Sequence, residues 1–127
     1  MYGHHIDIAG PFDQALERVQ AALKAEGFGV LSDIDIQKAM KEKLGKDMPA
    51  YRILGACNPP LAHQALQADP EIGLLLPCNV VVQEASDGVT ISIADPRAMF
   101  SLVDNPRLTP VVEEADQRLR RVIASLD

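Results

Sequence analysis

Apolar and polar residues follow two different periods along the chain. Residues 4–9 and 89–93 alternate between apolar and polar side chains, and this period of two predicts half-buried strands. Over residues 12–23 and 108–126, apolar side chains recur every three or four positions, which predicts two amphipathic helices. Gly27 follows the first of these helices and is a natural C-cap, because glycine adopts a positive φ without steric hindrance.

A turn signal predicts how two of the strands pair. Asp87-Gly88 directly precedes the alternating segment 89–93 and favours a tight hairpin, since this dipeptide accepts positive φ angles. We therefore expect residues 80–84 to pair antiparallel with residues 89–93.

The segment between the first helix and residue 50 predicts a strand and a short helix. Residues 28–36 favour a strand in which Val30 and Ile34 share one face, and residues 37–44 favour a helix. Four lysines make residues 38–46 the most basic part of the chain. A solvated helix face and a binding patch are both compatible with them.

The central stretch, residues 51–84, contains both cysteines and the densest apolar runs. Tyr51–Cys57 is short, apolar and bounded by prolines, which favours a strand over a helix. Asn58 is a good helix N-cap, because its side-chain oxygen accepts an N–H of the first turn, and Pro59 suits the first helical position. Asp69-Pro70 ends that helix, since the α conformation is disfavoured before a proline.

The remaining elements complete an α+β pattern. A second apolar run, Leu74–Val82, predicts a buried strand with an irregularity at Pro77. Asp95-Pro96 predicts a short helical turn after the hairpin. The predicted order is β-α-β-α-β-α-β-β-α, which indicates a mainly antiparallel sheet packed against helices, in one domain over residues 1–127.

Two segments of the central stretch carry a family resemblance. YRILGACNPPLAHQAL (residues 51–66) and PEIGLLLPCNVVV (residues 70–82) resemble the core signature of the bacterial and archaeal family known as domain of unknown function 302. The resemblance extends over nearly the whole chain, and the length of the chain suits a single copy. It implies an α+β fold and a dimer, and it implies no activity for any residue.

Composition and charge exclude several classes of partner. The formal net charge is -6 at pH 7, whereas nucleic-acid binding requires clustered basic residues. No apolar run approaches the roughly 20 residues that span a bilayer, and the first ten residues lack a signal-peptide pattern. We expect a cytoplasmic protein with reduced cysteines and without a nucleic-acid or membrane partner. Apolar residues make up 47% of only 127 residues, which favours a homodimer.

Each cysteine is followed by an asparagine. The twenty residues between Cys57 and Cys78 match neither a Cys-x-x-Cys redox pair nor zinc-finger spacing. Cys57 precedes a predicted helix N-terminus, where N–H groups and the helix dipole lower the pKa of a thiol. Cys57 is therefore a candidate nucleophile, and His63, one turn into the helix, is its candidate base.

Two accounts of the Cys-Asn pairs remain open. In the first, Cys57, Asn58, Cys78 and Asn79 bind a small ligand beside the helix N-terminus, whose free N–H groups suit an anionic group. In the second, both asparagines satisfy backbone groups and both cysteines fill core space. No local spacing joins the cysteines to a histidine as metal ligands, so we expect no metal site and no cofactor.

The sequence leaves two hypotheses about function. The first is a non-enzymatic dimeric module that binds a small ligand or has a regulatory role. The second is a small thiol-dependent enzyme or redox protein that uses Cys57. The pKa of the Cys57 thiol discriminates between them, because the second hypothesis requires a thiolate at neutral pH.

Overall fold

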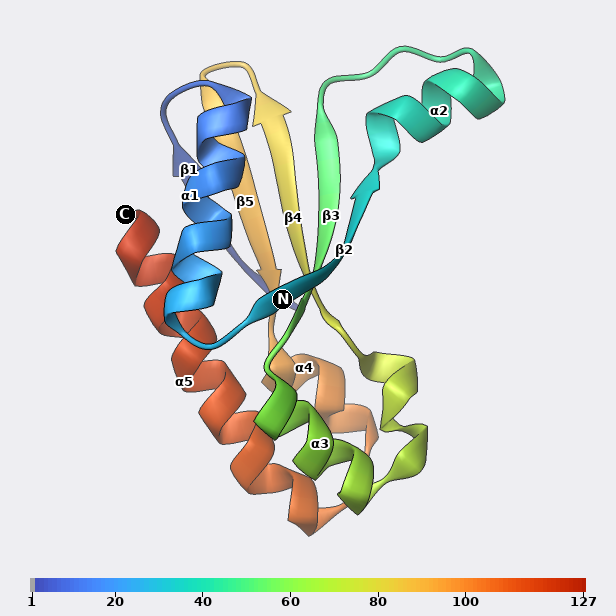
Figure 1. Ribbon diagram of the computed structural model, residues 1–127, viewed down its shortest axis with the longest axis vertical. Coiled ribbons are helices and arrows are strands. Elements are labelled where there is room, and N and C mark those ends of the chain that lie inside the picture. Colours follow the sequence, from blue (N-terminus) through green and yellow to red (C-terminus); the bar gives the residue numbers. More distant parts are fainter. Residues whose placement is uncertain (1) are drawn as a thin grey trace.

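Five antiparallel strands form one sheet in the computed structural model, which describes residues 2–127 (Figure 1). The strands are β1 (Gly3–Ile8), β2 (Gly29–Asp35), β3 (Tyr51–Cys57), β4 (Cys78–Ala85) and β5 (Gly88–Ala94). Their spatial order is β1-β5-β4-β3-β2, and every neighbouring pair is antiparallel. The predicted α+β fold and the predicted order of elements are confirmed.

Helices cover one face and one end of this sheet. The α-helices are α1 (Phe12–Ala25), α2 (Ile36–Leu44), α3 (Pro59–Ala68), α4 (Pro96–Met99) and α5 (Thr109–Leu126). Three 3-10 helices accompany them: η1 (Pro70–Leu75), η2 (Phe100–Leu102) and η3 (Pro106–Leu108). Figure 1 shows α1 and α5 side by side across the sheet, α3 and α4 at its end, and α2 projecting from β2. None of the helices in residues 2–127 is both long enough and apolar enough to cross a bilayer.

The apolar residues form two clusters. The main cluster joins the inner face of the sheet to α1 and α5, with Val19, Ile91 and Leu119 among its buried members. The second cluster lies at the end of the sheet, where side chains of α3, η1, η2, η3 and α5 meet around Phe100. This second cluster supports both cavities described below.

The β4–β5 hairpin follows the predicted register. Ala85 is opposite Gly88, and Val80 is opposite Ile93. Val89, Ile91 and Ile93 are buried, whereas the residues between them are only half-buried, as the alternation predicts. The pairing of residues 80–84 with 89–93 is confirmed.

The strand predicted for Leu74–Val82 is wrong in its first part. Strand β4 begins only at Cys78, and Leu74 and Leu75 belong to η1, which ends before Leu76 and Pro77. Asp69 caps η1, because its side chain accepts the N–H of Glu71 at 3.0 Å, and Pro70 follows as its first residue. Ile72 and Leu75 of η1 pack on the second cluster instead of pairing with a strand, and Ile72 is fully buried there.

The shared face predicted for Val30 and Ile34 is also wrong. The register between β2 and β3 shifts between Val30 and Ser32. Such a bulge inserts one residue and reverses which face the following side chains occupy. Val30 therefore lies opposite Ala56 and packs against the core, whereas Ile34 lies opposite Ile53 and is 49% exposed.

Candidate functional site

Both cysteines lie where β3 ends and β4 begins. Ala56 is the direct cross-strand partner of Cys78, and Cys57 is the next residue of β3. Both thiols are free and half-buried, and both line one small cavity. The other walls come mainly from α3 and from the second cluster: Phe28, Leu61, Ala62, Ala65, Leu76 and Phe100.

This cysteine cavity has room for water and little else. Its volume is about 30 Å³, and one water molecule needs roughly 10–15 Å³ by the same measure. Sites for drug-sized ligands have volumes of roughly 300–1,000 Å³. A ligand of metabolite size would enter only if a wall of the cavity moved.

Asn58 uses its side chain as the cap of α3. Its Oδ1 accepts the N–H of Leu61 at 3.3 Å, and its carbonyl oxygen accepts the N–H of Ala62 at 2.9 Å. The residue is 8% exposed, so this hydrogen bond replaces water for a buried amide oxygen. The predicted cap is confirmed, and one of the N–H groups expected to face a ligand is already satisfied.

The pKa values of both thiols are raised. Burial raises the pKa of Cys57, and burial together with the charge of Cys57 raises the pKa of Cys78 to about 11. The expectation that the start of α3 lowers the pKa of Cys57 is therefore wrong. Both side chains are neutral thiols at physiological pH, where a nucleophile has to be a thiolate.

Two of the predicted site residues lie outside the cysteine cavity. Asn79 is exposed on β4 opposite Gly55, and successive side chains of a strand point to opposite faces of the sheet. His63 is exposed on α3 and does not line the cavity. The structure thus brings together Cys57, Asn58 and Cys78, and it separates His63 and Asn79 from them.

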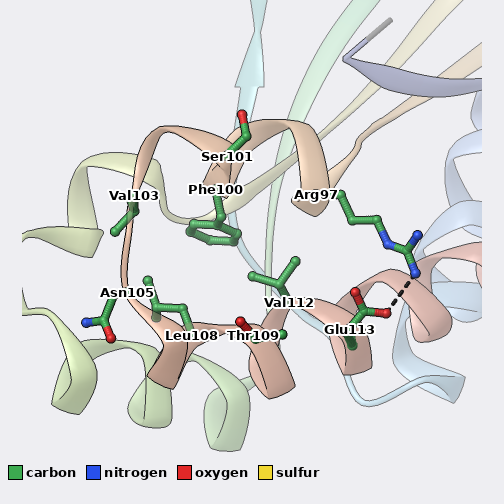
Figure 2. A pocket seen from close by; sticks show the side chains of 9 residues that line it. All are labelled: Arg97, Phe100, Ser101, Val103, Asn105, Leu108, Thr109, Val112 and Glu113. Carbon is green, nitrogen blue, oxygen red and sulfur yellow. Dashed lines mark hydrogen bonds and ion pairs between the residues drawn. The ribbon is translucent and has the colours of Figure 1, made fainter.

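A larger cavity lies between the α4–η2 segment and the start of α5. Its volume is about 320 Å³, within the range of small-molecule sites. Figure 2 shows Phe100, Leu108 and Val112 in its middle, with the Arg97–Glu113 pair at one end. Ser101, Val103, Asn105 and Thr109 complete its lining.

Arg97 connects this larger cavity to a buried carboxylate. Its Nη2 donates to Oε2 of Glu113 at 2.7 Å, and its Nε lies 3.3 Å from Oδ2 of Asp116. The same Oδ2 accepts the Nε–H of Arg120 at 2.9 Å. Asp116 is only 1% exposed, and a buried carboxylate requires such partners to remain charged.

Asp116 also belongs to a group of side chains with metal-ligating atoms. His4 of β1, Asp95 before α4 and Asp116 of α5 each offer one such atom, and these atoms all lie within 4.8 Å of one another. The three residues are far apart in the sequence, so no local spacing indicates them. The sequence does contain one signal for Asp116. This residue follows Val112 by four positions and precedes Leu119 by three, so helical periodicity places its carboxylate on the apolar face of α5.

Comparisons with known proteins agree on one family. The family model described as "Domain of unknown function DUF302" matches residues 4–126. A crystal structure of an uncharacterized conserved DUF302 protein from Bacillus stearothermophilus is similar over 100% of this chain and 99% of that chain, with 27% identity and a TM-score of 0.91. No curated protein matches the chain. The resemblance carried by residues 51–66 and 70–82 is confirmed.

Proposed function

This chain belongs to the DUF302 family, and from that premise we propose that it is a dimeric module that binds a small anionic molecule with an apolar body. The observation that carries the proposal is the 320 Å³ cavity between α4 and α5. It combines apolar walls with a guanidinium group at one end, and ligand sites in proteins typically have this composition.

Arg97 supplies the contact to the anionic group. Its side chain and that of Glu113 are both about half exposed, so their ion pair lies where a ligand can reach it. A guanidinium group presents its N–H donors as a planar fork that matches a carboxylate or phosphate. A ligand anion would bind beside Glu113 or in its place, while Phe100 and Val112 contact the apolar part of the ligand.

The cysteine cavity extends this proposal. Phe100 lines both cavities, so the two cavities share a wall. This shared wall supports a secondary role for Cys57, Asn58 and Cys78 in ligand binding. The exposed position of Asn79 counts against a role for that residue.

A thermal-shift screen with small aliphatic and aromatic carboxylates and phosphates tests the proposal. A ligand that binds only the folded state raises the midpoint of unfolding. We expect at least one compound to stabilise the wild type, and we expect this shift to be lost in Arg97→Gln. Val112→Phe, which fills part of the cavity, should also abolish it.

A matched control makes the screen specific. Arg107→Gln removes a neighbouring exposed arginine that does not line the cavity, so the ligand should raise its midpoint of unfolding as much as that of the wild type. Cys57→Ser tests the secondary role of the cysteine cavity and should reduce the shift if the ligand extends into that cavity. The proposal fails if no compound stabilises the wild type, or if Arg97→Gln and Arg107→Gln respond alike.

A redox role is the second candidate function, and the closeness of the two free thiols is the observation that favours it. The raised pKa values of Cys57 and Cys78 count against it, because thiol–disulfide exchange starts from a thiolate.

We also infer a cytoplasmic location, since free thiols are typical of a reducing compartment.

Apolar surfaces that residues 2–127 leave exposed support the homodimer. Amphipathic helix α2 has no buried residue within Ile36–Leu44, and it projects from the rest of the molecule (Figure 1). Apolar Tyr51, Ile53 and Val81 lie on the sheet face opposite the main cluster, next to the exposed Ile34. A second copy of the chain is a fitting partner. The segment around α2 is basic whereas the chain as a whole is acidic, so the basic segment of one copy can contact acidic surface of the other.

A further inference from the structure

We propose that His4, Asp95 and Asp116 form a binding site for a divalent transition-metal ion such as Zn²⁺ or Mn²⁺. One ligand atom of each residue lies within 4.8 Å of the other two. An imidazole nitrogen combined with carboxylate oxygens is a donor set that suits these ions. Three protein ligands leave coordination positions open, which is typical of sites that bind water or a substrate on the metal.

The sheet register brings two of the ligands together. Gly3 of β1 lies opposite Ala94 of β5, and the N–H of Asp95 donates to the carbonyl oxygen of Tyr2 at 2.9 Å. This pairing holds His4 beside the end of β5, where its Nε2 is 3.8 Å from Oδ2 of Asp95. Asp116 reaches the same point from α5, which packs against β1.

One side-chain atom of His4 and one of Asp116 are buried without a hydrogen-bond partner. Within residues 2–127, neither Nε2 of His4 nor Oδ1 of Asp116 has such a partner. Asp116 is 1% exposed, so water reaches its carboxylate poorly. Buried polar atoms in folded proteins are nearly always satisfied, and each exception calls for an explanation. A metal ion bound between the three side chains would satisfy both atoms at once.

The other oxygen atoms of the two carboxylates already have partners, which orients the ligands. Oδ1 of Asp95 accepts the N–H of Arg97 at 2.9 Å as the cap of α4, while its Oδ2 is the atom nearer His4. Oδ2 of Asp116 accepts from Arg120 and lies near Arg97, so Oδ1 remains available. Hydrogen bonds of this kind hold metal ligands in place and tune their affinity.

Charge and distance are both compatible with a cation. The carboxylates of Asp95, Glu113 and Asp116 outnumber the guanidinium groups of Arg97 and Arg120 by one. Bonds of about 2.0–2.2 Å to a metal place its ligand atoms roughly 3–4 Å apart. The side chains therefore need only a small inward movement to close on an ion.

Calorimetric titration of the untagged chain with ZnCl₂ and with MnCl₂ tests the proposal. We expect the wild type to bind at least one of the two metals, with about one ion per chain. His4→Ala and Asp95→Asn should each weaken that binding by about tenfold or more, because ligands matter at least as much as their hydrogen-bond partners. Asn is itself a good helix cap, so Asp95→Asn removes charge while keeping α4 capped.

His5→Ala is the matched control. Its ring bonds Ser92 at 2.8 Å, and its side chain points to the sheet face opposite that of His4. This variant should bind the ion as the wild type does, and the ion should raise its midpoint of unfolding equally. The proposal is overturned if the wild type binds neither ion, or if His4→Ala and His5→Ala bind with equal affinity. The carboxylate screen is independent of this titration, so either proposal can fail alone.

Discussion

At Cys57, the local position in the sequence and the tertiary environment act on the thiol in opposite directions. Free N–H groups at the start of a helix stabilise a neighbouring thiolate and so lower the pKa of the thiol. At the start of α3, however, the side chain of Asn58 already accepts one of these N–H groups, that of Leu61. Burial between strands and α3 disfavours the thiolate, and it raises the pKa. The environment prevails, so both cysteines behave as small apolar side chains with a protonated sulfur.

The first prediction concerns the titration of these thiols. We expect little thiolate at neutral pH and deprotonation of Cys78 only at about pH 11, since burial penalises its charged form. Ultraviolet absorbance of the thiolate measures this, with the Cys57→Ser/Cys78→Ser double variant subtracting the tyrosine signal. A thiolate already formed at neutral pH would restore the thiol-dependent hypothesis.

The same shift predicts a dependence of stability on pH. The folded state keeps a proton on Cys78 that the unfolded chain releases near its ordinary pKa of about 8.5. The free energy of unfolding should therefore be unaffected by this group below that pH and should fall as the pH rises towards about 11. Urea unfolding across this range should show a shallower loss in Cys78→Ser than in the wild type.

The two asparagines of the Cys-Asn pairs predict different effects of substitution. Asn58→Ala should lower the free energy of unfolding by about 1 kcal/mol, because it removes the cap of α3. Asn79→Ala is the control and should change it by less than about 0.5 kcal/mol, since the side chain is exposed. Equal losses in urea unfolding would show that the cap contributes nothing specific.

The sequence identifies residues whose role is local and misses those whose role depends on distant partners. Asn58 was predictable, because a cap needs only the N–H groups of the next turn. His4 and Asp95 were not, because their proximity depends on the β1–β5 register. Asp116 was visible only as a charge on an apolar helix face, without any indication of its arginine partners.

At the scale of elements, periodicity predicts helices and strands well but does not fix where a strand begins or which face it presents. The α1 and α5 helices and the β4–β5 hairpin follow the pattern, since each has a regular apolar stripe. The bulge in β2 leaves no periodic signal and reverses the face of Ile34. The run before Cys78 is apolar for another reason, because η1 packs on the second cluster.

Gly88 gives a prediction for the hairpin and the edge strand. A Cβ at this position would collide with the carbonyl oxygen of Ile8, and its φ of 153° is rare for other residues. Gly88→Ala should lower the free energy of unfolding by about 2 kcal/mol, because backbone atoms of β1 have to shift. Gly73→Ala is the control, since a Cβ there meets nothing within 4 Å. Similar urea midpoints for both variants would contradict this account.

At the scale of the whole molecule, residues 2–127 cover one face of the sheet with α1 and α5 and leave the other face without a helical layer. A half-covered antiparallel sheet is stable when its second face is polar, as Thr90 and Ser92 make it near β5. Towards β2 and β3 the same face becomes apolar, with Ile53 and Ile34 adjacent. The sequence could not assign these residues to an interface. The apolar content of a chain indicates how much apolar surface needs a partner, but it does not indicate where on the fold that surface lies.

The last prediction is that a second copy covers this apolar region. Ile34→Glu places a charge on a face that the dimer would bury, so it should convert the dimer to a monomer in light scattering at micromolar concentration. Leu74→Glu is the control, because Leu74 is 85% exposed on η1, away from this face, and its variant should remain dimeric. A monomeric wild type would refute the dimer itself. If Ile34→Glu remains dimeric, the dimer interface lies elsewhere on the molecule. Helix α2 is then the next surface to test, because it projects from the molecule and none of its residues is buried.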